Sequence, residues 1–124
     1  VTLVPCIQTL GHMGQFLRWP SSSDFKDQSD VLLIGQSSSI IKDMLDFCQK
    51  AFKTDKIHVG MDETFGFGFG QYHKKFGYET PENLFMKHLL DVNRLVNETK
   101  FKKMYIWSDM FSLLICSKKN LKCL

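Results

Sequence analysis

The stretch from Ile57 to Glu63, IHVGMDE, decides the fold and the position of the candidate site. Its first residues are apolar and favour a short strand over residues 56–61, and two carboxylates follow at once. Neighbouring residues of a strand point to opposite faces, so Asp62 and Glu63 can share a site only if the backbone turns out of the strand there. Gly60 permits such a turn. The stretch therefore predicts a strand that ends in a pair of carboxylates.

Two further apolar runs lie on either side of this stretch. Residues 3–9 (LVPCIQT) are typical of a strand buried on both faces of a parallel sheet, and residues 104–107 (MYIW) predict a third strand. Between the strands, residues 40–52 and 80–96 carry apolar side chains at helical spacing. The order strand, helix, strand, helix, strand predicts an α/β fold of about three parallel strands with two right-handed crossover helices.

The starts of both helices are marked in the sequence. Thr80 is a suitable N-cap and is followed by proline, while Ser38 or Ser39 can cap the earlier helix. The remaining segments are predicted to be irregular. Residues 18–39 form a long connection, of the kind that is functional or mobile in compact domains, and residues 62–77 form a glycine- and aromatic-rich loop.

Composition limits the classes of protein to consider. Of 124 residues, 44% are hydrophobic and 23% are charged, the ordinary globular mixture, and the net charge of +3 is too small to indicate a nucleic-acid partner. No run approaches the ~20 apolar residues of a membrane span, and no signal peptide is visible, which favours an intracellular location.

The four cysteines have no C-x-x-C spacing, so we expect reduced thiols. Because the chain begins with Val1 close to a predicted strand, we expect a piece of a longer protein.

Chemically reactive side chains follow all three predicted strands. His12 comes after the first strand, Asp62 and Glu63 follow the second, and Trp107 and Asp109 end the third. Because sites in parallel α/β folds form at the carboxyl ends of the strands, we expect these side chains to share one site. Glycosidases use an arrangement of two acids held close together beside an aromatic wall.

Two other kinds of site fit the sequence less well. A metal site would recruit His12, His58 and Asp62, with His73 as a further candidate. His58 and Asp62 are four positions apart, however, and such positions on a strand are separated by ~13 Å. We therefore predict no metal and expect His58 to be a buried structural residue. Residues 66–70 (GFGFG) lack the lysine of a P-loop and the spacing of a dinucleotide fingerprint, so we expect a packed or sugar-stacking loop there.

The stretch from Ile57 to Glu63 resembles the H-x-G-x-D-E signature of family 20 glycoside hydrolases, the β-N-acetylhexosaminidases. Residues 4–12 (VPCIQTLGH) resemble the preceding strand and its Gly-His loop, most closely in the hexosaminidase D-like branch, which has Q-T-x-G-H there. Residues 106–111 (IWSDMF) resemble the next strand of that branch. Three motifs in this order make the resemblance much more specific than any one of them.

The resemblance implies a partial (β/α)8 barrel over residues 1–114, with the third, fourth and fifth strands, and an unassigned basic tail over residues 115–124. It implies that the full-length protein removes terminal β-linked N-acetylhexosamine from a glycan or glycoconjugate, with retention of configuration and without a cofactor. The 2-acetamido oxygen of the substrate is the nucleophile in this family. Because much of the pocket lies on other strands, we expect the chain alone to be inactive.

The roles of individual residues follow from the positions that they match. Glu63 matches the general acid/base, Asp62 the acid that orients the acetamido group, and His12 the histidine that contacts the general acid. Trp107 matches an aromatic wall of the acetamido pocket, and Asp109 a polar residue at the sugar. Two alternatives stay open: a catalytically silent glycan-binding module, and a small flavodoxin-like α/β domain that binds a nucleotide or a protein partner.

Overall fold

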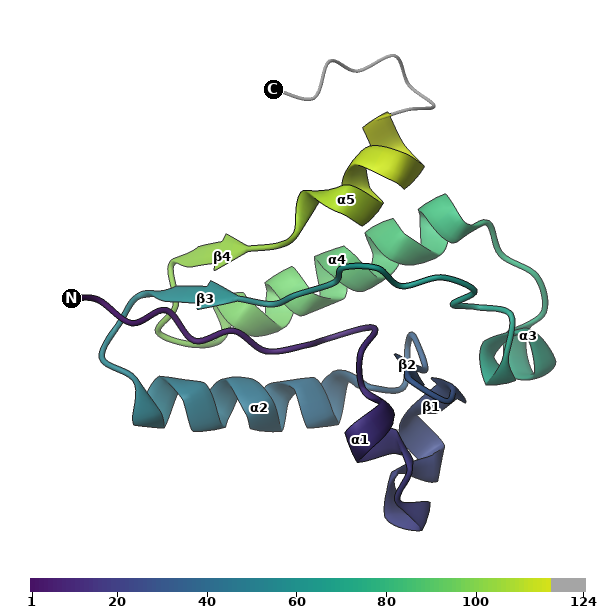
Figure 1. Cartoon of the computed structure of the whole chain (residues 1–124), viewed down its shortest axis with the longest axis horizontal. Coiled ribbons are helices and arrows are strands. Elements are labelled where there is room, and N and C mark those ends of the chain that lie inside the picture. The colour runs from purple at the N-terminus through teal and green to yellow at the C-terminus, as the bar shows by residue number, and fades with distance from the viewer. Residues whose placement is uncertain (117–124) are drawn as a thin grey trace.

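The computed structural model describes residues 1–116 and has a mixed α/β fold with one parallel and one antiparallel pair of strands (Figure 1). The α/β class is therefore confirmed, while two such small sheets do not show the partial (β/α)8 barrel that the sequence predicts. The predicted basic tail lies, from residue 117 onward, outside the described residues, as does Cys123. No helix within residues 1–116 combines the length and the apolar character needed to cross a bilayer.

The parallel pair consists of β3 (Lys56–His58) and β4 (Lys103–Tyr105), in a register that places Ile57 beside Met104. Both strands are shorter than predicted, but their parallel arrangement is confirmed. The pairing continues past the strands, because the N–H of Val59 donates to the carbonyl of Tyr105 over 2.9 Å. The two strands therefore still run together at the point where the carboxylates follow.

The first predicted strand is reduced to an extended segment with one isolated parallel bridge, between Cys6 and His58. The N–H of Ile7 donates to the carbonyl of His58, and the N–H of His58 donates to the carbonyl of Pro5, each over 2.9 Å. The prediction that this segment is buried on both faces was wrong, because Leu3 is 67% exposed and Cys6 is exposed as well. The segment pairs with β3. Pro5 has no backbone N–H and therefore cannot extend the hydrogen-bond ladder between them.

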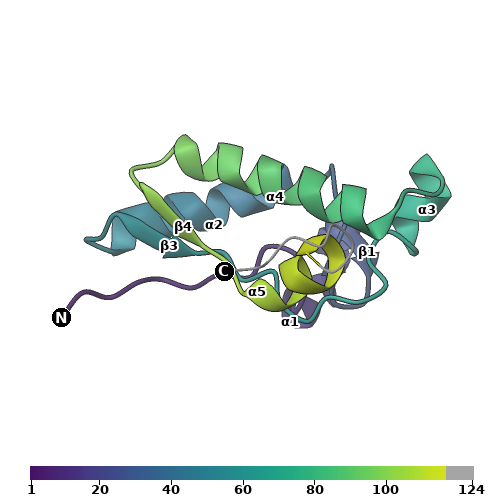
Figure 2. The same cartoon turned by 90° about the horizontal axis from the view of Figure 1, so that it is seen from above.

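Helices α2 (Ser38–Ala51) and α4 (Pro81–Asn97) pack side by side on the same side of the strands (Figure 2). Both match the predicted helices. Thr80 is the N-cap of α4 as predicted, and its hydroxyl oxygen accepts from the N–H of Asn83. The N-cap of α2 is Ser37 and not Ser38 or Ser39, and the Ser37 hydroxyl instead donates to the carbonyl of Leu33 over 2.8 Å.

The prediction of an irregular connection over residues 18–39 was wrong. After α1 (Gly14–Leu17), this segment holds the 3-10 helix η1 (Pro20–Phe25) and the antiparallel strands β1 (Lys26–Gln28) and β2 (Val31–Leu32). Local sequence does not reveal these short elements because their stability comes from burial. Residues 31–34 are at most 2% exposed and belong to the main core.

The glycine- and aromatic-rich loop contains a helix that was not predicted, α3 (Gln71–Phe76). Asp27 of β1 holds this region in place. Its carboxylate is buried and accepts from the N–H groups of Gly68 and Tyr72 over 2.8 and 2.7 Å. A buried carboxylate that satisfies two backbone donors orders the loop and supplies the acceptor for the start of α3.

The chain leaves β4 through Trp107 into α5 (Ser108–Phe111), which continues as the π-helical turn η2 (Ser112–Cys116). The core lies between the strands and the two long helices. Its largest fully buried side chains include Ile41, Leu45, Ile57, Leu84 and Phe85. This packing fixes the strand ends, which carry the chemically reactive residues.

Candidate active site

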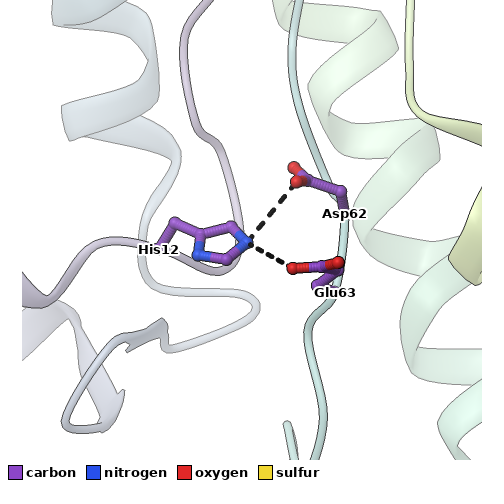
Figure 3. Close-up of side chains that lie close together, drawn as sticks. All are labelled: His12, Asp62 and Glu63. Atoms are coloured by element: carbon purple, nitrogen blue, oxygen red, sulfur yellow. Dashed lines mark ion pairs between the residues drawn. The ribbon is translucent and has the colours of Figure 1, made fainter.

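The structure brings together the five candidate residues that the sequence places after three strands. His12 follows the N-terminal segment, Asp62 and Glu63 follow β3, and Trp107 and Asp109 follow β4. Asp62, Glu63, Trp107 and Asp109 line one open pocket of about 280 Å³. The close-up shows His12 directed toward both carboxylates from the opposite loop (Figure 3).

One ring nitrogen of His12 faces both acids (Figure 3). Its Nε2 atom is 3.4 Å from Oδ2 of Asp62 and 3.9 Å from Oε2 of Glu63. The side chains differ in exposure: Asp62 is 23% exposed, His12 43% and Glu63 72%. A ligand in this pocket can therefore reach Glu63 readily, while Asp62 is the less exposed of the two carboxylates.

The backbone at this site includes residues with positive φ angles, which residues other than glycine rarely adopt. The φ angles are +56° at His12, +70° at Met61 and +43° at Glu63, and within the described residues these are the non-glycine residues with positive φ. Each such position costs about 1–3 kcal/mol, which the surrounding structure must offset. Gly60, with φ of +71°, begins the turn, as the sequence predicts. The turn allows adjacent carboxylates to face the same histidine.

Asp62 is held by a residue that the sequence analysis did not single out. The side-chain amide of Gln8 donates through Nε2 to Oδ1 of Asp62 over 3.0 Å. The hydroxyl of Thr64 donates to the backbone carbonyl of Asp62 over 2.9 Å. Gln8 is the first residue of the Q-T-x-G-H motif, three positions before Gly11, but the sequence does not indicate its contact with Asp62.

Asp109 has a contact within the protein in addition to its place in the pocket. Its Oδ2 atom accepts a 2.9 Å hydrogen bond from the backbone N–H of Glu63. The start of α5 thus supports the strained backbone of Glu63. The sequence predicts Asp109 at this site but not this hydrogen bond, because nothing local indicates the partner.

Trp107 forms one wall of the pocket and is 51% exposed. Its ring packs against the ring of His58, with 4.6 Å between the centroids and 50° between the planes. The expectation that His58 is a buried structural residue was wrong as to burial, since the residue is half-buried. The half-exposed Trp107 face is suited to stacking on an apolar sugar face.

His58 is held in its neutral form. Its Nδ1 atom accepts from the N–H of Gly60 over 3.1 Å and lies 3.6 Å from Sγ of Cys6. Burial lowers the pKa of His58, although the nearby Asp62 opposes this shift. Burial likewise raises the pKa of the Cys6 thiol, and Asp62 adds to that rise. Both groups are therefore uncharged beside the candidate carboxylates at neutral pH.

His88 of α4 is a second residue that the sequence analysis missed. It is 2% exposed, and its Nε2–H donates to the carbonyl of Thr9 over 2.6 Å. The hydroxyl of Thr9 in turn donates to the carbonyl of Val59 over 2.8 Å. Burial lowers the pKa of His88. The sequence does indicate that His88 is buried, because it lies between Leu84 and Val92 at helical spacing on the buried face of α4.

The same cluster has the donor set of a cation site. One ligand atom each from His12, Asp62 and Glu63 can be chosen so that all lie within 4.8 Å of one another. This set contains Glu63 in place of the His58 considered from the sequence. An imidazole and two carboxylates also suit acid–base chemistry, which needs no metal.

A larger pocket of about 480 Å³ lies between the N-terminal segment and α2. Apolar side chains line most of it, and Asp43 is the one carboxylate among the lining residues. We place the candidate site at the smaller pocket, because that pocket combines three carboxylates, a histidine nearby and an aromatic wall.

A comparison of the sequence with models of known protein families finds no match, and a search of curated proteins finds none either. The interpretation of the site therefore rests on its residues and their geometry.

Proposed function

We propose that the full-length protein hydrolyses terminal β-linked N-acetylhexosamine, with the described pocket as its reaction centre. The observation that carries the proposal is the pair of adjacent carboxylates, turned to one side by positive φ angles and joined by His12. Trp107 adds a half-exposed aromatic wall to the same pocket. Carboxylates beside an aromatic surface are the groups that glycoside hydrolysis requires.

In the first step Glu63 donates its proton to the glycosidic oxygen as the bond to the anomeric carbon breaks. The acetamido oxygen of the same sugar forms the new bond to that carbon, and the leaving group departs as an alcohol. The resulting oxazolinium ion carries its positive charge on the acetamido nitrogen. Asp62 accepts a hydrogen bond from that N–H and stabilises the charge, which suits its less exposed position.

In the second step the carboxylate of Glu63 takes a proton from water as the water oxygen attacks the anomeric carbon. The bond to the acetamido oxygen breaks, the acetamide is restored, and the configuration is retained after two inversions. His12 contacts both carboxylates and orients Glu63 between the steps. Each step is thus assigned to a residue that lies at the pocket or beside it.

The arrangement of strands supports a segment of a (β/α)8 barrel as the scaffold. The N-terminal segment, β3 and β4 lie next to one another in chain order, and the two long helices lie on one side of them. The candidate residues follow the carboxyl ends of these strands, where such barrels carry their sites. Other strands of the barrel would supply the remaining walls of the pocket.

The test compares binding by this chain with hydrolysis by the full-length protein. We expect N-acetylglucosamine to perturb the NMR signals of Trp107 and Glu63 in the chain, without turnover. In the full-length protein, we expect turnover of a chromogenic β-N-acetylglucosaminide that Glu63→Gln abolishes. Glu98→Gln is the matched control, since Glu98 is an exposed acid that pairs with Arg94 on α4.

The outcomes separate the alternatives. Binding by the full-length protein without hydrolysis would identify a glycan-binding module that uses the same aromatic wall. Full turnover by the Glu63→Gln variant would remove Glu63 from the reaction. Neither binding nor hydrolysis of an N-acetylhexosaminide would overturn the proposal.

A further inference from the structure

We propose that Gln8 is a positioning residue for Asp62, and that it fixes the orientation in which this carboxylate meets the acetamido group. The inference rests on the proposed function and deepens it. Gln8 does not line the pocket. Its Nε2 atom donates to Oδ1 of Asp62 over 3.0 Å, while Oδ2 of the same carboxylate faces His12 at 3.4 Å. Both oxygens of Asp62 are thus directed by other side chains.

The side chain of Gln8 reaches Asp62 because the residue opposite has no side chain. A Cβ atom built on Gly60 would lie 2.2 Å from Oε1 of Gln8 and 2.9 Å from the carbonyl oxygen of Ile7. Gly60 also has the positive φ that favours glycine. The same residue therefore provides the turn after β3 and the space that the Gln8 amide occupies.

The amide of Gln8 can face Asp62 in one orientation only. Its Oε1 atom is buried and has no hydrogen-bond partner among the described residues. Rotation of the amide by half a turn would place this oxygen against a carboxylate oxygen, and two acceptors at that separation repel each other. An unsatisfied buried acceptor costs about 1–3 kcal/mol, so the structure retains this arrangement at the expense of stability.

A carboxylate held at both oxygens loses little freedom when the substrate's N–H approaches. The charge that it stabilises exists in the oxazolinium ion and the transition states around it, and not in the bound substrate. Loss of Gln8 should therefore lower kcat while KM changes little. A purely structural role would instead lower the amount of folded enzyme and leave the kinetics of each folded molecule unchanged.

The experiment uses Gln8→Ala and Gln8→Glu in the full-length protein. Gln49→Ala is the matched control, because Gln49 on α2 also donates through Nε2 to an aspartate, Asp46, over 2.8 Å. We expect Gln8→Ala to lower kcat about 100-fold per folded molecule, the cost of a misplaced reacting group, and Gln49→Ala to leave it unchanged. Wild-type kcat in the Gln8→Ala enzyme would overturn the proposal.

Gln8→Glu gives a second readout, in the pH profile. The introduced carboxyl group can donate to Asp62 only when it carries a proton, so we expect the rate relative to wild type to recover as the pH falls. A constant ratio of the two rates across the pH range would contradict the role assigned to the Gln8 N–H.

Failure of the proposed function is recognised separately. If the wild-type full-length protein hydrolyses no N-acetylhexosaminide, the proposed function is wrong. NMR of this chain still tests the hydrogen bond between Gln8 and Asp62 in that case. Asp62→Asn removes the charge at constant shape, and we expect it to shift the side-chain amide signals of Gln8 but not those of Gln49. Unchanged Gln8 signals would overturn the positioning role whatever the activity of the protein.

Discussion

The backbone N–H of Glu63 donates a 2.9 Å hydrogen bond to Oδ2 of Asp109. This bond joins the turn after β3 to the first turn of α5, and it supports a residue whose φ angle is +43°. The side chain of Glu63 itself is 72% exposed. The backbone conformation of Glu63 is therefore supported by an aspartate of α5, the helix that follows β4.

Replacement of Asp109 by alanine should loosen the turn at Glu63. We expect Asp109→Ala to lower the free energy of unfolding by about 1 kcal/mol, because the lost hydrogen bond is exposed to water. It should also weaken binding of N-acetylglucosamine. Asp109→Asn keeps an acceptor oxygen and should retain most of the stability and most of the binding. Urea denaturation measures the change in stability, and NMR titration measures the change in binding. Asp24→Ala on η1 is the control. Equal losses of stability and binding in the Asp109→Ala and Asp109→Asn variants would refute the role of the acceptor oxygen.

Gly60→Ala should destabilise the protein more than Gly35→Ala. Both glycines have positive φ, +71° and +86°, so alanine is strained at either position, at about 1–2 kcal/mol. Nothing lies within 4 Å of a Cβ built on Gly35, whereas a Cβ on Gly60 meets the Gln8 amide at 2.2 Å. Urea denaturation of both variants gives the difference directly. Equal destabilisation would show that the Gln8 amide moves away freely.

Stability should fall as the pH drops below about 6.5, and His88 should account for part of the loss. Burial lowers the pKa of His88 in the folded protein, while Asp91 and the Thr9 carbonyl oppose the shift. The unfolded chain therefore binds a proton first, and the stabilisation present above the ordinary pKa is lost as the pH falls toward the folded value. His58 contributes with the same sign.

The measurement is the urea midpoint as a function of pH. We expect His88→Gln, which keeps a side-chain N–H donor, to flatten the profile between about pH 7 and 5, where histidines titrate. His73→Gln is the control, because His73 is an exposed residue of α3. A profile that stays as steep in the His88→Gln variant as in wild type would exclude His88 as the cause.

Trp107 should report on ligand binding, and Trp19 should not. Both indoles are exposed, 51% and 57%, but only Trp107 lines the candidate pocket. We expect N-acetylglucosamine to change the tryptophan emission of the Trp19→Phe variant and to leave that of Trp107→Phe unaltered. Trp107→Ala should weaken binding about fivefold, the equivalent of about 1 kcal/mol of ring stacking. A ligand response that survives in Trp107→Phe would place the binding site elsewhere.

The elements that the sequence predicts correctly are those with local causes. Thr80 followed by proline marks the start of α4, and apolar residues at helical spacing mark the buried faces of α2 and α4. The connection over residues 18–39 was mistaken for an irregular one, because η1, β1 and β2 depend on burial against segments far along the chain. Asp27 is an example, since its carboxylate meets Gly68 and Tyr72.

By itself, the sequence determined that His12, the two carboxylates and Trp107 follow three extended segments that run in the same direction, because chain direction places their ends on one side. Only the tertiary structure decided how these groups are oriented. Gln8 meets Asp62 across Gly60, and Asp109 meets the N–H of Glu63, through contacts between segments that are distant in the chain. Such contacts leave no periodic pattern in the sequence, because each depends on the packing of the whole core.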